Sequence, residues 1–261
     1  TFFLALIHGA ESNESTRVLK VGYADCDPIF QDEAGNYSGY GVSYLEEIAR
    51  YTQWKYEYVF DSWENCMKRL ANGELDITIM THQLSDRRGV FLFSNIPMGY
   101  DYPVLYAPAN SDIYYQDYKA FDGARIGVST ETYFKETLNV YLQEMELNCE
   151  IVPFSTDSKA KDALAQGTID MMASSVFTPQ KNVKVVDRFS FSPGYICTNK
   201  QNRKLMDEIN IAMQKIRIHH PDLEEILMRS FYNVSKDATH LYLTREEREY
   251  IDSVGPIVIK G

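Results

Sequence analysis

Basic residues are scarce in this 261-residue chain. Lysine and arginine total 26, against 37 aspartates and glutamates, and the formal net charge is −11. A protein that binds nucleic acid needs a basic face, and so does one that docks on anionic lipid. The charge balance therefore argues against nucleic acid and lipid surfaces as partners. It leaves small molecules open as ligands, because a single arginine in a cleft acts locally.

Long hydrophobic runs are also missing, and no stretch approaches the roughly 20 residues that span a bilayer. An apolar run does occupy residues 2–7, and polar residues follow it. This pattern resembles the end of a signal or anchor segment, so we expect residues 1–16 to be the remnant of one. An N-terminal strand is the alternative. The first interpretation predicts an extracytoplasmic location, periplasmic or at the cell surface, with a membrane tether outside this chain.

Signals for metal, cofactor and catalytic chemistry are thin. The sequence contains no CxxC pair, no GxSxG, no HExxH, no P-loop and no GxGxxG. Its five histidines have no metal-ligand spacing, so we expect no metal site, no cofactor and no enzymatic activity. The four cysteines, which are widely spaced, are Cys26, Cys66, Cys149 and Cys197. We expect them to be mostly buried free thiols. Disulfide bonds between them are the alternative for an exported chain, and the sequence does not give their connectivity.

Strand and helix patterns alternate in two successive sets. In the first half, apolar periodicity predicts strands at 18–22, 55–60 and 77–80, with helices at 41–51 and 63–71. In the second half it predicts strands at 125–128, 150–154 and 171–173, with helices at 132–146 and 157–166. Strands separated by single helices indicate a mostly parallel sheet covered by helices on both faces.

A short internal repeat links the two halves. Residues 70–77 and 164–171 both read L-A-x-G-x-(L/I)-D-(I/M), and in each the glycine is expected to end a helix before a buried strand. The simplest account is two similar α/β lobes. A strand expected at 189–198 returns the chain to the first lobe, so two connections cross between the lobes and form a hinge beside a cleft.

This organisation sets the expected domain limits. Lobe 1 comprises residues 17–102 and 197–238, and lobe 2 comprises residues 103–196. The capping box at 244–247 and the strand pattern at 257–261, which resembles 18–22, predict that residues 239–261 are a linker and the first strand of a following, similar module. The alternative is an edge strand of the same domain.

An ordered set of motifs then resembles a known family. Residues 19–23, 27–30 and 35–42, followed by Ser85-Asp86-Arg87-Arg88 and Phe93-Ser94, are similar to family 3 of the bacterial extracellular solute-binding proteins. The resemblance implies the two-lobed type 2 periplasmic-binding (Venus flytrap) fold with two hinge strands. Because residues 239–261 have the pattern of a second module, the chain resembles the first of the tandem sensor domains of membrane-bound histidine kinases and diguanylate cyclases.

The resemblance also implies a ligand site between the lobes. Arg88 is expected to hold a carboxylate with its planar fork of donors, and Trp63 matches an aromatic wall. Thr132 is expected to start a helix whose free N–H groups can hold an anion, although it also reads as an ordinary N-cap. The full set of expected ligand contacts is Asp27, Trp63, Thr81, Gln83, Ser85, Arg88, Ser129, Thr132, Tyr133 and Ser175.

One departure from the family bears on the ligand. Members that bind α-amino acids carry acidic residues, which hold the ammonium group of the ligand, where this chain has Ser175 and Ala24. Asp25 or Asp27 could supply the missing negative charge. An amino-acid ligand is therefore only one option. The sequence favours a non-enzymatic sensor domain for an amino-acid-like or other anionic solute, joined to further domains of the same polypeptide. The alternatives are the binding protein of a transporter and an enzyme on the same fold, a dehydratase or lytic enzyme, with Asp27 as its acid.

Overall fold

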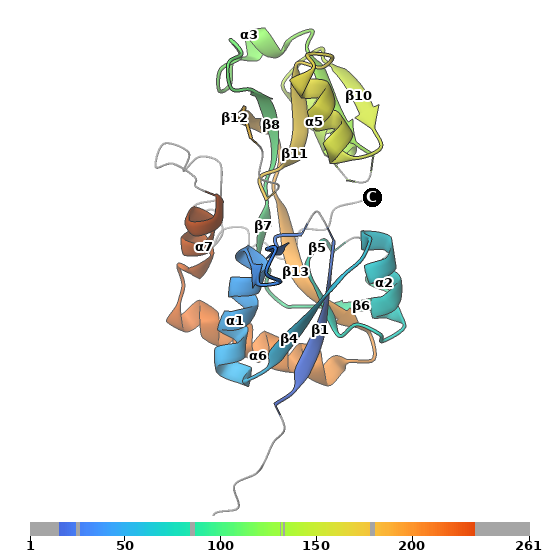
Figure 1. Ribbon diagram of the computed structural model, residues 1–261, viewed down its shortest axis with the longest axis vertical. Coiled ribbons are helices and arrows are strands. Elements are labelled where there is room, and N and C mark those ends of the chain that lie inside the picture. Colours follow the sequence, from blue (N-terminus) through green and yellow to red (C-terminus); the bar gives the residue numbers. More distant parts are fainter. Residues whose placement is uncertain are drawn as a thin grey trace, which may run out of the picture.

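The computed structural model describes residues 16–24, 27–83, 87–130, 132, 134–177 and 181–232. These residues form two lobes, each built on one mixed sheet with helices on both faces. Figure 1 shows the lobe that contains β8 to β12 above the lobe that contains β1 to β6, with β7 and β13 running towards the junction. The two-lobed α/β fold expected from the sequence is confirmed.

Lobe 1 has the strand order β4-β1-β5-β13-β6, with β7 paired to β13. β1 is parallel to both β4 and β5, whereas β13 is antiparallel to β5, β6 and β7. A small β2–β3 hairpin precedes the first helix. The elements are β1 (Val18–Tyr23), β2 (Phe30–Gln31), β3 (Tyr37–Ser38), α1 (Tyr40–Thr52), β4 (Lys55–Phe60), α2 (Trp63–Ala71), β5 (Ile77–Thr81), β6 (Phe91–Phe93), β7 (Gly99–Asp101), β13 (Ser192–Asn199), α6 (Arg203–His219) and α7 (Leu223–Tyr232).

Lobe 2 repeats the same core order, with β10-β9-β11 followed by β8 and β12. β9 is parallel to β10 and β11, and β8 is antiparallel to β11 and β12. The elements are β8 (Pro103–Pro108), α3 (Tyr118–Phe121), β9 (Arg125–Ser129), α4 (Phe134–Glu144), β10 (Glu150–Phe154), α5 (Asp157–Ala165), β11 (Met171–Ser175) and β12 (Val183–Arg188).

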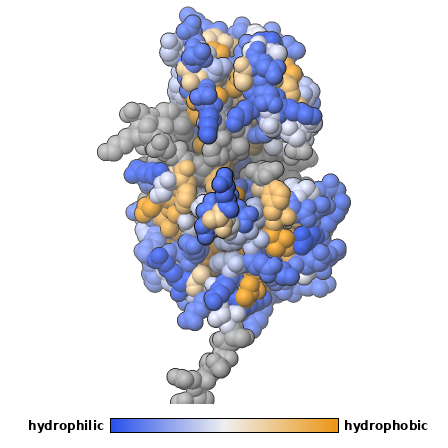
Figure 2. Space-filling view, viewed as in Figure 1, coloured by the Kyte–Doolittle hydropathy of each residue, from blue (hydrophilic) through white to orange (hydrophobic). Residues whose placement is uncertain are grey.

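Each sheet buries an apolar core on both faces. In lobe 1, α1, α6 and α7 share one core, while Cys66 and Leu70 of α2 pack on the other side against Leu75, Phe91 and Cys197. In lobe 2, α4 covers one face and α5 the other. On the face shown in Figure 2, the described residues are mostly hydrophilic, with small, separate hydrophobic areas.

Some local expectations differ from the structure. The helix expected at 132–146 ends at Glu144, because Glu146 adopts a φ of +54° that leaves the helical region, and Met145 is therefore exposed rather than inward. The strand expected at 189–198 begins at Ser192. The lobe boundary expected after residue 196 falls inside β13, and the division of the chain at that point stays a proposal.

The described cysteines are free thiols, and none of the described helices could span a membrane. Cys66 and Cys197 are buried and Cys149 is half-buried, all as free thiols, whereas Cys26 lies outside the described ranges. In the part of the chain that the structure describes, no helix has the length and apolar character needed to cross a membrane.

The repeated motif has the same structural role in both lobes. Its aspartate accepts a hydrogen bond from the neighbouring parallel strand, which is β1 in lobe 1 and β9 in lobe 2: Lys20 N–H donates to Asp76 Oδ2 at 2.8 Å, and Arg125 N–H donates to Asp170 Oδ2 at 2.9 Å. The glycines of the motif have φ values of +77° and +71° at the helix ends, where glycine adopts this conformation without strain. The motif therefore fixes the return from helix to strand in each lobe.

A second glycine in each lobe packs against the leucine or isoleucine that precedes the aspartate of the motif. A Cβ added at Gly127 would lie 2.4 Å from Ile169 Cδ1, as one at Gly22 would lie 2.5 Å from Leu75 Cδ1. Because Ile169 is buried, we expect Gly127→Ala to overpack this contact and lower the free energy of unfolding by about 1–3 kcal/mol. Urea unfolding measures the change. Gly89→Ala, which meets no atom within 4 Å, is the control, and an equal loss in both variants would contradict the prediction.

Candidate functional site

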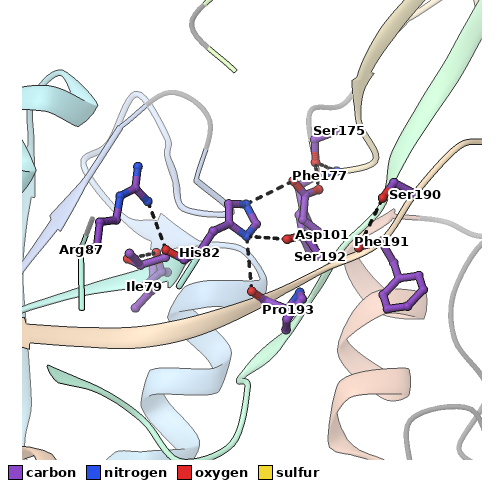
Figure 3. A network of polar contacts seen from close by, with 11 residues as sticks. Ile79, His82, Arg87, Asp101, Ser175, Phe177, Ser190, Phe191, Ser192 and Pro193 are labelled. Carbon is purple, nitrogen blue, oxygen red and sulfur yellow. Dashed lines mark hydrogen bonds and ion pairs between the residues drawn. The ribbon is translucent and has the colours of Figure 1, made fainter. Parts of the chain in front are cut away.

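The ends of β5 and β11 meet around the strands that connect the lobes. His82 directly follows β5, Ser175 is the last residue of β11, and β7 and β13 pair so that Asp101 lies opposite Ser192. In α/β sheets, ligands bind beyond the carboxyl ends of the strands. We call His82, Asp101, Ser175 and Ser192 the hinge cluster; Figure 3 shows the His82 ring between Arg87 on one side and Asp101 on the other.

Hydrogen bonds tie the hinge cluster to both lobes. His82 Nδ1 lies 3.0 Å from Ser192 Oγ and 3.3 Å from the Pro193 carbonyl oxygen. Ser175 Oγ donates to Asp101 Oδ1 and accepts from the Phe177 N–H at 3.0 Å. The other Asp101 oxygen, Oδ2, lies 3.9 Å from His82 Nε2. The Asp101 and His82 side chains are 12% and 17% exposed to solvent, so solvent still reaches them.

Burial perturbs two titratable groups here. It lowers the pKa of His82 to about 4, and the nearby positive charge of Arg87 acts in the same direction, so the imidazole is neutral at pH 7. Burial also raises the pKa of Asp27 to about 7. The Ala24 N–H, which donates to Asp27 Oδ2 at 2.8 Å, opposes this rise, and the charge of Asp101 adds to it. Asp27 therefore holds its proton for about half the time at neutral pH.

The two neighbouring arginines differ in their surroundings. Arg87 is half-buried, its Cζ lies 5.6 Å from the centre of the Trp63 ring, and its Nη1 donates to the His82 carbonyl oxygen at 3.2 Å. Arg88 is exposed, and its Nη2 donates to Gln83 Oε1 at 3.2 Å. The structure thus places Arg87 beside the hinge cluster and the aromatic wall, and turns Arg88 to solvent, although the resemblance assigned the anion contact to Arg88.

The other residues expected to contact the ligand lie in lobe 1, in lobe 2 or outside the described residues. Thr81 is fully buried, and its hydroxyl is held by Thr78 Oγ1 at 2.9 Å and by the Ile79 carbonyl oxygen at 3.3 Å, so that hydroxyl is engaged inside lobe 1. In lobe 2, Thr132 Oγ1 donates to the Ser129 carbonyl oxygen at 3.1 Å, directly beyond β9. Ser85 and Tyr133 lie outside the described residues, as do residues 239–261 and all of 1–16 except Thr16.

Sequence reasoning missed three members of this site. His82 offers no metal-ligand spacing in the sequence, and within the described residues no group of histidines, cysteines and acids is placed to hold a metal ion. Asp101 carried a usable signal, because it is the only charged residue in the otherwise apolar stretch 96–108. Ser192 carried none, since a serine next to a proline is common in loops.

Comparisons with known proteins match the chain to a family and to similar folds. The family model described as bacterial extracellular solute-binding proteins, family 3, matches residues 19–244. No curated protein matches the chain.

Three solved structures illustrate the likeness. A probable amino-acid ABC transporter extracellular-binding protein from Bacillus subtilis is 20% identical with a TM-score of 0.72, over 83% of this chain and 97% of that one. A putative L-cystine ABC transporter from Listeria monocytogenes is 22% identical, with a TM-score of 0.61 over 88% and 99%. An ancestral amino-acid-binding protein, described as a precursor of cyclohexadienyl dehydratase, is 18% identical, with a TM-score of 0.64 over 82% and 95%. At these identities the likeness shows the fold.

Proposed function

The chain belongs to family 3 of the bacterial extracellular solute-binding proteins, and we propose that it binds a small amino-acid-like solute between its lobes, outside the cytoplasm. The observation that carries this proposal is the position of Arg87, half-buried on the Trp63 ring and hydrogen-bonded to the His82 carbonyl oxygen next to the hinge cluster. Similar structures described as amino-acid-binding proteins support the same class of solute.

The chemistry of the solute follows from these groups. A guanidinium offers a planar fork of five N–H donors that matches a carboxylate bidentately, and partial burial strengthens the pairing. Trp63 supplies an aromatic face beside it. We therefore assign the carboxylate contact to Arg87, one residue before the position that the resemblance implies.

Thermal unfolding with a ligand panel tests the proposed function. The purified chain is heated alone and with each of the standard amino acids, and with the corresponding carboxylic acids that lack the amino group. A ligand present at about 100 times its Kd stabilises the folded state by about 2.7 kcal/mol, or roughly 5–10 °C for a domain of this size. If no compound raises the melting temperature at millimolar concentration, the proposed class of solute is wrong.

The biological role admits two readings, sensing and transport. We favour a sensor domain, because residues 239–261 have the pattern of a linker and the first strand of a second module. The similar structures described as transporter proteins support transport equally well. A strain that lacks the gene distinguishes the two: loss of growth on the ligand as sole nitrogen source indicates transport, and loss of ligand-dependent gene expression indicates sensing.

A dehydratase-type activity is a second candidate function. The observation that favours it is the pKa of Asp27, raised to about 7, which suits a general acid or base at neutral pH. One similar structure is also described as the precursor of a cyclohexadienyl dehydratase. Incubation with a cyclohexadienyl substrate tests this candidate. Turnover that disappears in Asp27→Asn would support an enzyme, and binding without turnover would favour the solute-binding role.

A further inference from the structure

The two large sheets end in four edge strands, which are β4 and β6 in lobe 1 and β10 and β12 in lobe 2. An open edge can pair with a strand of another chain. β6 has only three residues, and β10 carries Pro153, which has no N–H to offer, at a position that faces away from β9. The outer side of β12 is occupied, because the Gln116 N–H donates to the Val186 carbonyl oxygen at 2.8 Å. β4 is the edge that remains.

The backbone of β4 points alternately towards β1 and away from it. The Lys55 N–H at one end and the Asp61 N–H just beyond the other donate to the β1 segment, at 2.9 and 3.1 Å, so the odd-numbered residues face β1. Tyr56 and Tyr58 therefore direct their N–H and carbonyl groups outwards. Among the described residues, no partner bonds to the Tyr56 backbone, and only the Tyr37 hydroxyl reaches the Tyr58 carbonyl oxygen, at 3.5 Å.

The exposed charges of β4 complement a second copy of the same strand. Lys55 and Glu57 are both exposed and, being two residues apart, lie on one face of the sheet. In an antiparallel pair with Tyr56 opposite Tyr56, each Lys55 lies opposite Glu57 of the other copy, close enough for an ion pair. A centre one residue earlier places Lys55 opposite Lys55, and a centre one residue later places Glu57 opposite Glu57. The charges therefore favour the register centred on Tyr56.

The outward backbone groups fit the same register. Opposite residues of an antiparallel pair exchange both of their N–H···O=C bonds when their backbone groups face each other, and Tyr56 meets Tyr56 of the second copy in this way. Tyr58 then lies opposite Trp54 of the second copy. All three side chains are half-buried and lie on the face opposite to Lys55 and Glu57, so aromatic rings are also brought together across the pair.

We propose that β4 is a homodimer interface, in which two copies of the chain pair antiparallel about Tyr56 and join their lobe 1 sheets into one. This goes beyond the proposed function, because neither Arg87 nor the hinge cluster takes part in it. A single strand pair covers little surface, so the dimer dissociates on dilution. At the low micromolar concentrations of unfolding experiments the chain is monomeric, and Lys55 and Glu57 are then simply exposed side chains.

Sedimentation velocity of the purified chain without ligand tests the proposal. Over a range of roughly 1 to 500 μM, we expect the wild-type chain to pass from monomer to dimer. Lys55→Glu and Glu57→Lys each place like charges opposite each other on both sides of the two-fold axis. Each should raise the dissociation constant of the dimer at least about tenfold, because like charges opposed across an interface suppress association.

Combining the two reversals tests the register. The double variant Lys55→Glu with Glu57→Lys restores opposite charges across the axis and should dimerise like the wild type. A mixture of the two single variants should form a heterodimer, since one chain then carries two acids and the other two lysines at these positions. Glu150→Lys reverses an exposed charge on β10, the edge strand of lobe 2, and is the matched control. Melting temperatures at low concentration show whether each variant folds.

Each result decides for or against the interface. A wild-type chain that stays monomeric at the highest concentration overturns the proposal. A dimer that persists in both single reversals, or that Glu150→Lys weakens as strongly, lies on another surface and overturns it as well. If the single variants are monomeric but neither the double variant nor the mixture dimerises, the register centred on Tyr56 is wrong. None of these outcomes depends on the binding of a solute.

Discussion

Replacement of Arg87 by alanine is expected to weaken binding of the solute by about 10- to 150-fold. A hydrogen-bonded charge contributes about 1.5–3 kcal/mol, and the carboxylate of the solute loses this partner in a partly buried setting. Arg87 lies on the Trp63 ring and is held by the His82 carbonyl oxygen. The affinity is measured by calorimetry with the amino acid that gives the largest melting shift.

Arg88→Ala is the matched control, because the same side chain is removed one residue away from an exposed position. It should leave the affinity nearly unchanged. Arg87→Lys should restore part of the loss, since a point charge does not reproduce the fork of donors. A larger effect for Arg88→Ala than for Arg87→Ala would return the carboxylate contact to the position that the family resemblance implies.

The second large effect is on the pH dependence of stability. The pKa of Asp27 rises from 3.8 to about 7 in the folded state, so the folded state binds a proton that the unfolded chain releases. The stabilisation that this proton provides is complete below about pH 4 and is lost as the pH rises to 7. At about 1.36 kcal/mol for each pH unit, the loss is up to about 4 kcal/mol.

His82 acts in the opposite sense over an overlapping range. Its pKa falls from 6.5 to about 4, so its contribution is present above pH 6.5 and is lost as the pH falls towards 4. In the wild-type chain the two contributions oppose each other. Asp27→Asn should therefore gain stability relative to wild type as the pH rises from about 4 to 7, and His82→Gln should lose stability relative to wild type as the pH rises from about 4 to 6.5.

Urea unfolding at several values between about pH 4 and 8 measures both differences. The asparagine side chain in Asp27→Asn keeps an oxygen that can accept from the Ala24 N–H, so the comparison isolates the titration. Glu57→Gln supplies the baseline for removing an exposed carboxylate. If the curve of Asp27→Asn runs parallel to that of the wild type throughout, Asp27 does not carry the assigned proton.

The parts of the fold that follow from local rules were predictable from the sequence. The L-A-x-G-x-(L/I)-D-(I/M) repeat located a glycine turn and a buried strand in each lobe, because positive φ and apolar periodicity leave direct traces in residue type. The sequence did not show that Asp76 and Asp170 bond to a strand more than forty residues earlier. Such pairings depend on tertiary contact and not on spacing.

The site was harder to predict for the same reason. Arg87 and Arg88 are identical in type and adjacent in sequence, so only the path of the loop determines which one faces Trp63. His82, Asp101 and Ser175 are distant along the chain and meet only because β5, β7 and β11 end at the junction of the lobes. The family resemblance predicted Asp27, Trp63 and Ser175 as site residues. Their partners could be identified only from the folded structure.

The chain order of the strands has a consequence for the timing of folding. The five strands of lobe 2, β8 to β12, are consecutive in the sequence, whereas β13 lies between β5 and β6 in the sheet of lobe 1 although more than ninety residues separate it from either strand. As the chain emerges from a ribosome or a secretion pore, amino end first, lobe 2 can complete its sheet while that of lobe 1 still has a gap. His82 and Asp101 acquire Ser192 and Pro193 only when β13 fills that gap. The proposed binding site is thus assembled by one of the last strands to emerge, so we expect that a nascent chain does not bind solute before both lobes are in place.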